Sequence, residues 1–258
     1  MLMLDMARAL SMGGYLFLNE DFKCVEPCKV LILEQELGEY VLSDRCQKVW
    51  RDEKDLDRVN ENLWYVSRSS HINFSTRVGL DLVRKWLDLV QPNVLILDPI
   101  GKMHHYMEND AQHVNSLMEN LDALRDDYVH NSMSIVFSHH FGKANPDPDR
   151  SRDVLDPYNF RGSTKWIDDV DTIITGVRPK KWTFIENPGT PQKYKWWKLR
   201  LGFTLRAGQE PENIVVSINE FNDLRVRFQG YEDGENQEKW FSQKSSKSLT
   251  IGKGKTNV

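Results

Sequence analysis

Residues 94–98 read Val-Leu-Ile-Leu-Asp, and residues 30–34 read Val-Leu-Ile-Leu-Glu. Four consecutive apolar residues leave no polar face, so each run predicts a strand covered on both sides, as in a parallel sheet. Runs at 133–137 and 171–175 have the same character and predict a third and a fourth buried strand. Because ligands of such sheets bind beyond the carboxyl ends of the strands, the acidic ends of the first two runs point to a site.

Helix-period segments separate these strands. The spacing of apolar residues predicts helices at 2–12, 38–50, 76–90 and 110–128, the last with Asn109 as its N-cap. A short strand is expected at 62–66. This alternation predicts an α/β fold, with a mostly parallel sheet flanked by helices.

After residue 180 the pattern changes to strands and turns, which predicts antiparallel β-hairpins at one edge of the sheet. The expected strands are 182–185, 194–205, 214–218 and 224–228. The chain is therefore expected to divide into an α/β core at 1–180, a β-rich extension of the same domain at 181–242 and a disordered basic tail at 243–258.

The charge is unevenly distributed along the 258 residues. The net charge is −4, with 40% hydrophobic and 28% charged residues, which excludes a collagenous or wholly disordered chain. Residues 178–206 carry +7, residues 207–258 carry −1, and residues 1–177 carry −10. A basic strip therefore lies on an acidic body.

Three cysteines in a chain of this size fit a reducing cytoplasm. Cys24 and Cys28 have no further ligands at zinc-finger spacing. The first ten residues lack a basic leader and no run of 18 apolar residues occurs, so neither a signal peptide nor a membrane span is expected.

Polar residues follow three of the predicted strands. Glu34, Gln35 and Glu36 follow the first, Asp98 follows the second, and the third is followed by a polar triplet, Ser138, His139 and His140. A strand that ends in Asp can hold Mg²⁺ through its water shell beside a phosphate, although such an Asp also often only caps a loop. A nearby Glu could deprotonate an attacking water, and an imidazole could sense the γ-phosphate.

The order VLILEQE (30–36), VLILDPI (94–100), SIVFSHH (134–140) and FRGSTKWIDDVDTII (160–174) resembles the RecA-like ATPase core of the RepA-type hexameric replicative helicases. It is similar, more distantly, to the DnaB-like helicases, and the likeness covers roughly residues 1–210.

The resemblance implies ATP and Mg²⁺ as cofactors and single-stranded DNA as partner. It also implies a homo-oligomeric ring, which is a hexamer in that family. It makes Asp98 the Mg²⁺-binding Asp, Glu36 the catalytic Glu and His140 the phosphate-sensing residue, with His139 and Ser138 beside the nucleotide. Two arginines are implied to act at subunit interfaces, namely Arg161 and Arg206.

A phosphate-binding G-x-x-x-x-G-K-[ST] segment is absent from the printed sequence. Gly254-Lys255-Thr256 spells its end, but Leu249 stands where the first Gly belongs. Residues 1–14 resemble the helix that follows this segment, so the chain is expected either to be N-terminally shortened or to have lost hydrolysis.

Basic residues interleaved with aromatic ones suggest contacts with single-stranded nucleic acid, although such alternation can equally reflect a sheet with one face in water. The candidates in this alternating segment are Lys195, Lys198 and Arg200. The resemblance implies three more, Lys143, Arg150 and Arg152, because loops in this region of ring helicases face the central channel.

Two alternatives remain open. One is a catalytically silent nucleic-acid-binding or assembly subunit with the same fold. The other is a metal-dependent phosphohydrolase built on Asp98 and the pairs His104-His105 and His139-His140.

Overall fold

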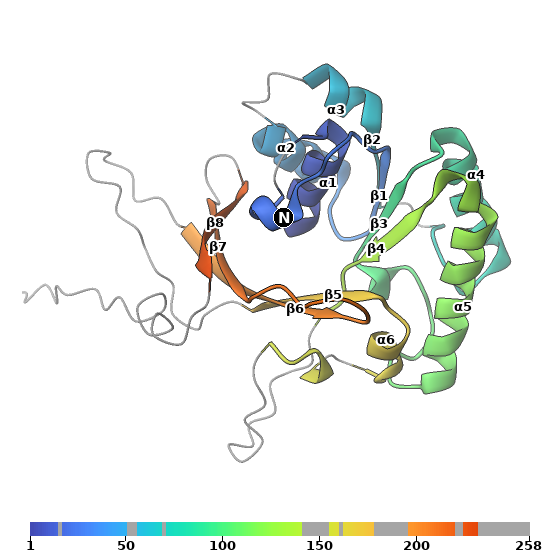
Figure 1. The fold of residues 1–258 in the computed structure, drawn as a ribbon. Coiled ribbons are helices and arrows are strands. Elements are labelled where there is room, and N and C mark those ends of the chain that lie inside the picture. The colour runs from blue at the N-terminus through green and yellow to red at the C-terminus, as the bar shows by residue number, and fades with distance from the viewer. Residues whose placement is uncertain are drawn as a thin grey trace, which may run out of the picture.

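Two separate four-stranded sheets frame the protein in its computed structural model (Figure 1). The structure describes residues 1–14, 17–50, 56–68, 71–140, 155–159, 162–177, 196–219 and 224–231. The first sheet is parallel, in the order β2-β1-β3-β4, and the second is antiparallel, in the order β5-β6-β7-β8. The predicted α/β class with a largely parallel sheet is confirmed.

The parallel strands are β1 (Val30–Glu34), β2 (Leu63–Ser67), β3 (Val94–Asp98) and β4 (Ser134–Phe137). The helices around them are α1 (Leu2–Met12), α2 (Glu39–Trp50), α3 (Leu56–Asn62), α4 (Arg77–Val90) and α5 (Ala111–Asp127). The four predicted helices are confirmed, whereas α3 was not predicted because its seven residues show too little periodicity.

Each face of the parallel sheet is covered by helices (Figure 1). Alternate residues of β1 explain this arrangement: Leu31 and Leu33 pack with α4 and α5, whereas Val30 and Ile32 pack with α1, α2 and α3. All five residues of β1 are buried. A continuous apolar run is therefore required, because neither face meets water.

The antiparallel sheet consists of β5 (Thr172–Val177), β6 (Trp196–Leu205), β7 (Ile214–Asn219) and β8 (Val226–Tyr231). Two predictions are wrong here. Residues 171–175 do not extend the parallel sheet, because β5 pairs antiparallel with β6. The hairpins form a sheet of their own rather than an edge of the first one. A buried-strand pattern fixes the faces of a strand but not its neighbour.

Helix α1 joins the two sheets. Its residues Leu4 and Ala7 belong to the core of the parallel sheet, and Ala9 belongs to the core under β6, β7 and β8. The buried Asp5 accepts hydrogen bonds from Arg8 Nε at 2.9 Å and from the backbone N–H of Val226 at 3.3 Å. The carboxylate therefore ties the first helix to the last described strand.

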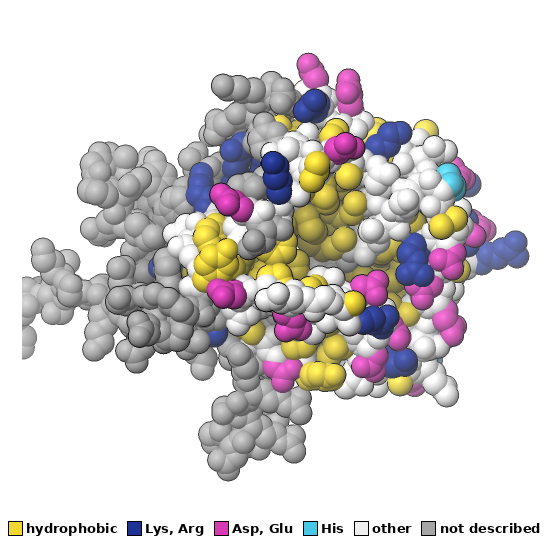
Figure 2. All heavy atoms as spheres, in the orientation of Figure 1, with side chains coloured by type: hydrophobic (Ala, Val, Ile, Leu, Met, Phe, Trp, Pro, Cys, Tyr) yellow, Lys and Arg dark blue, Asp and Glu magenta, His cyan; other side chains and the backbone are white. Residues whose placement is uncertain are grey.

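Strand β4 is an edge strand of unusual composition. Within the described residues it pairs only with β3. Ile135 and Phe137 pack on one core cluster and Val136 on the other, yet all three are only half-buried, so the prediction of a fully buried strand is corrected. Hydrophobic side chains gather in a hollow at the centre of the face drawn in Figure 2. A strand that is apolar on both faces is unusual at an open edge.

The N-cap of α5 lies one residue later than the sequence predicted. Asp110, not Asn109, caps the helix, with its carboxylate accepting from the backbone N–H groups of Gln112 and His113 at 2.9 and 3.2 Å. Both residue types suit an N-cap, so the pattern alone leaves this choice open.

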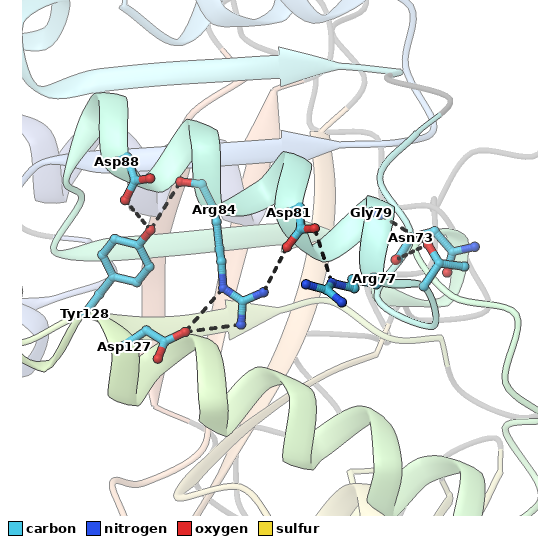
Figure 3. Close-up of polar contacts among 9 residues, drawn as sticks. Asn73, Arg77, Gly79, Asp81, Arg84, Asp88, Asp127 and Tyr128 are labelled. Atoms are coloured by element: carbon cyan, nitrogen blue, oxygen red, sulfur yellow. Dashed lines mark hydrogen bonds and ion pairs between the residues drawn. The ribbon is translucent and has the colours of Figure 1, made fainter.

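Helices α4 and α5 are held together by a polar clasp (Figure 3). Tyr128, just after α5, donates its hydroxyl hydrogen bond to Asp88 Oδ1 at 2.5 Å and contacts Arg84 O at 3.2 Å. Burial and the Asp88 carboxylate raise the pKa of Tyr128, so the phenol keeps its proton. The Arg84 guanidinium lies between Asp81 and Asp127.

Replacement of Tyr128 by Phe is expected to lower the free energy of unfolding by about 1.5 kcal/mol, because a hydrogen bond to a charged carboxylate is removed. Urea denaturation measures the change. Tyr65→Phe, at an exposed site on β2, is the matched control and should have little effect. Equal effects of the two variants would contradict a stabilising clasp.

Candidate functional site

Three strand ends meet at the carboxyl edge of the parallel sheet. Glu34 at the end of β1 lies directly opposite Asp98 at the end of β3 in the sheet register. Ser138, the residue after β4, donates its hydroxyl hydrogen bond to Asp98 Oδ1. Two carboxylates and a hydroxyl from three strand ends therefore lie at one edge of the sheet.

The loops at this edge are tied to one another through the backbone. The N–H of Gln35 donates to Asp98 O at 3.0 Å, and the N–H of Ile100 donates to Ser138 O at 3.0 Å. The N–H of Ser138 in turn donates to Leu97 O at 3.0 Å. These bonds continue the sheet pairing beyond the strands and hold the site residues in fixed positions.

The two glutamates after β1 have different roles. Glu34 is 3% exposed, and its two carboxylate oxygens accept from the backbone N–H groups of Glu36 at 2.7 Å and Leu37 at 2.6 Å. Burial raises the pKa of Glu34, and the neighbouring carboxylates of Asp98 and Glu36 act in the same direction. Its oxygens are used to shape the loop, whereas the side chain of Glu36 is 45% exposed.

Glu36 and His140 lie together. His140 Nε2 is 3.7 Å from Glu36 Oε1, and the two side chains are 74% and 45% exposed. A carboxylate and an imidazole from different strand ends thus flank accessible space, an arrangement suited to orienting a water molecule and contacting an anion. His139 points elsewhere: its side chain is 3% exposed and its ring centroid lies 4.6 Å from that of Trp166.

The N-terminus of α1 is close enough to the same edge for its charge to be affected by the acids there. Burial lowers the pKa of the Met1 amine, while the carboxylates of Asp98, Asp5 and Glu34 raise it. The amine is therefore within electrostatic reach of the two acids at the strand ends. The positive end of a helix dipole placed here favours an anion such as a phosphate.

Of the two arginines implied by the family resemblance, the structure describes Arg206 alone. Arg206, just after β6, is 52% exposed at its side chain and lies 3.5 Å from Asp171 Oδ1. It also donates a side-chain hydrogen bond to Asp168 O and its backbone N–H to Asp171 O at 2.9 Å. Arg161 lies outside the described residues.

Of the nucleic-acid candidates, four lie outside the described residues, namely Lys143, Arg150, Arg152 and Lys195. Lys198 on β6 is 8% exposed, and burial lowers its pKa. That burial does not favour a phosphate contact by Lys198, since the ammonium would have to leave its packed position. Arg200 is half-buried on the same strand.

Two features of the site were not predicted. Glu34 was noted only as a polar strand-end residue, and its loop-capping role follows from the turn at residues 34–37. Glu108, whose carboxylate lies 3.7 Å from His139 Nε2, comes from the segment before α5 and carries no sequence signal. Within the described ranges, no three His, Cys, Asp or Glu side chains converge to hold a metal ion, and no helix is long and apolar enough to cross a membrane.

A family model described as an AAA domain matches residues 1–146. This span covers all of the parallel sheet and its helices, including Asp98, Glu36 and His140. The chain belongs to the AAA domain family. It is therefore an AAA-domain P-loop NTPase by family, and its carboxyl-edge site is the one where this fold places nucleotides. Among curated proteins, no sequence matches the chain.

Glu34→Gln is expected to lower the free energy of unfolding by about 2 kcal/mol, because an amide offers only one acceptor to two buried N–H donors. Glu36→Gln should change it by less than about 0.5 kcal/mol, since that side chain is exposed. Urea denaturation of the two variants measures both effects. A larger loss for Glu36→Gln than for Glu34→Gln would show that the roles are reversed.

Proposed function

We propose that this AAA domain is the ATPase core of a RecA-like motor of the RepA-type replicative helicase kind, which couples ATP hydrolysis at subunit interfaces to single-stranded DNA binding or translocation. The observation that carries the proposal is the meeting of Asp98, Ser138, Glu36 and His140 at one sheet edge, beside the N-terminus of α1.

Each residue is proposed for one task. Asp98, with its carboxylate held by Ser138, would hold Mg²⁺ through the water shell of the ion, and the ion would neutralise phosphate charge. Glu36 orients and deprotonates the attacking water, because it is the accessible one of the two glutamates. His140, 3.7 Å away, contacts the terminal phosphate.

The phosphate cradle is proposed to come from a strand and loop outside the printed sequence, which has no G-x-x-x-x-G-K-[ST] segment. Two features support this step. The edge of β4 is unpaired among the described residues, although the strand is apolar on both faces. Met1, which precedes α1, and Met6 within it pack on the cluster that Val136 contacts and also on the one that Ile174 contacts, so α1 lies between the cores of the two sheets. A parallel strand added at β4 could lead through a phosphate-binding loop into α1.

ATP turnover tests the proposal directly. A chain carrying an apolar strand and a G-x-x-x-x-G-K-Thr loop fused ahead of Met1 should hydrolyse ATP with Mg²⁺, and Glu36→Gln should reduce the rate at least about 100-fold. The matched control is Glu39→Gln. Glu39 is the exposed first residue of α2, three positions after Glu36, and its replacement should leave the rate unchanged.

Two outcomes of this ATPase experiment would contradict parts of the proposal. If neither the printed chain nor the fused chain binds nucleotide at millimolar ATP, the motor hypothesis is wrong and a catalytically silent assembly subunit is favoured. Hydrolysis that survives Glu36→Gln would keep the ATPase but remove Glu36 from its role.

A ring is part of the same proposal, with Arg206 reaching the nucleotide of a neighbouring subunit. Its half-exposed side chain supports a role between subunits. Asp171 and the carbonyl of Asp168 hold the guanidinium at the surface. Such a fixed cation can neutralise charge that develops on a transferred phosphoryl group.

Single-stranded DNA is proposed to contact the antiparallel sheet on the face opposite its core, through the half-buried Arg200 and Arg227, whereas Lys198 and Ser217 on that face are buried. Leu199 and Leu201 point to the core of this sheet, so Lys198 and Arg200 lie on the opposite face. Arg227 on β8 faces Ser217, which in turn pairs with Lys198, and so belongs to that face too. Arginines on one sheet face can track a phosphate backbone.

Replacing Arg200 and Arg227 by Gln should weaken binding to single-stranded DNA, because each arginine is expected to neutralise a phosphate. The slope of log affinity against log salt should fall by about 0.7 for every phosphate that is no longer neutralised. Fluorescence anisotropy over a salt series measures the slope. Arg77→Gln, on the exposed surface of α4, is the control. An unchanged slope in the double variant removes this face from the proposal.

A further inference from the structure

Adjacent histidines after β4 point in opposite directions. His140 is 74% exposed and faces Glu36, whereas His139 is 3% exposed and faces the interior. The backbone of the two residues therefore connects the proposed water-activating site with a buried cluster behind it. The orientation of His140 depends on how firmly His139 is held.

His139 is held on three sides. Its Nδ1 lies 3.0 Å from the carbonyl oxygen of His140, and its Nε2 lies 3.7 Å from Glu108 Oε1. Its ring packs on Trp166, which is itself 3% exposed. The contact with the His140 carbonyl requires a proton on Nδ1. The 3.7 Å between Nε2 and Glu108 Oε1 is an ion-pair distance rather than a hydrogen bond, and the carboxylate attracts the ring through this nitrogen when Nε2 is also protonated.

Glu108 is joined to two further segments. A Cβ added to Gly101, in the loop after β3, would lie 2.8 Å from Glu108 Oε1, so the carboxylate fills the space that this glycine leaves. The backbone carbonyl of Glu108 accepts from the N–H of Ser163 at 2.8 Å. Gly162, with φ of +113°, approaches the same carbonyl so closely that an added Cβ would lie 2.5 Å from it.

A second imidazole near Glu108 does not compete for the carboxylate. His104 is 8% exposed, and burial lowers its pKa against the opposing effect of Glu108. A neutral His104 leaves the charge of Glu108 to face His139. The rings of His104 and Trp166, 6.1 Å apart, then complete the wall of the cluster.

We propose that Glu108 is a positioning residue: through the ring of His139 it fixes the backbone of His140, and through its own carbonyl it connects the site to the segment that precedes α6 (Lys165–Asp168). That segment leads to Asp168 and Asp171, which hold Arg206. The catalytic meaning of the inference rests on the proposed role of His140, but the positioning itself does not.

Nitrogen-15 NMR of the histidine side chains tests the positioning on the full printed chain. Glu108→Gln keeps the size of the side chain and removes the charge, and it should shift the ring nitrogen signals of both His139 and His140. Glu119→Gln, an exposed residue of α5 bonded to Asn115, is the matched control and should shift neither. The signals are assigned with His139→Gln and His140→Gln.

Two results overturn the proposal: unchanged signals of both histidines in Glu108→Gln, or a shift of His139 without any shift of His140. The exposed His71 and His130 report on the fold and should keep their signals. If Glu108→Gln does not fold, Glu108→Asp, which withdraws the carboxylate by one methylene, provides the same reading.

An activity arm separates this inference from the proposed function. In the ATP-hydrolysing fused chain, Glu108→Gln should lower kcat about tenfold with little change in KM for ATP. Carboxylates that orient a functional histidine have effects of this size when they are replaced. If the parent chain has no ATPase activity, the proposed function fails while the NMR result still decides the positioning. A normal kcat together with shifted histidine signals would show that Glu108 positions His139 without consequence for hydrolysis and would overturn the catalytic part.

Discussion

The parallel pairing of β1 with β3 is the constraint on which the rest of the structure depends. Both strands are covered on two faces, so their backbone groups can bond only to neighbouring strands, and their side chains must be apolar throughout. The register places Glu34 opposite Asp98 at the point where the apolar runs end. A slip of one residue would exchange the two faces of a strand and bury a carboxylate against helices, so the site and the core are fixed by the same pairing.

The sequence predicted the positions of most helices and strands well, but it predicted less well which strands pair with one another. Runs of four apolar residues identified β1 and β3, and apolar spacing identified α1, α2, α4 and α5. The prediction that β5 belongs to the parallel sheet was wrong. Its run of residues suits either sheet, and only the strand to which it is hydrogen-bonded distinguishes the two cases. Helix α6, with four residues, is too short to show a period.

The site was likewise predicted by residue type and corrected in detail. The carboxylates and the imidazole do meet, since strand ends of a parallel sheet share one edge. Which glutamate is accessible could not be read from the sequence, because it depends on a turn in which Glu34 accepts two backbone N–H groups. Alternation along β6 placed Lys198 and Arg200 on one face but said nothing about depth, and Lys198 is buried. Glu108 reaches the site from a loop, where no periodicity applies.

Among the described residues, one edge of β4 has no pairing partner, and this edge connects the observations above. An edge strand normally carries charge or a bulge that blocks further pairing, whereas Ile135, Val136 and Phe137 are apolar on both faces. The strand is followed by Ser138, His139 and His140, so a strand that pairs with it in parallel would end beside Asp98 and the N-terminus of α1. Completion of the sheet and completion of a phosphate site would then be one event. Since His139 and Glu108 fix the end of β4 from behind, that event would also be sensed in the segment that holds Arg206.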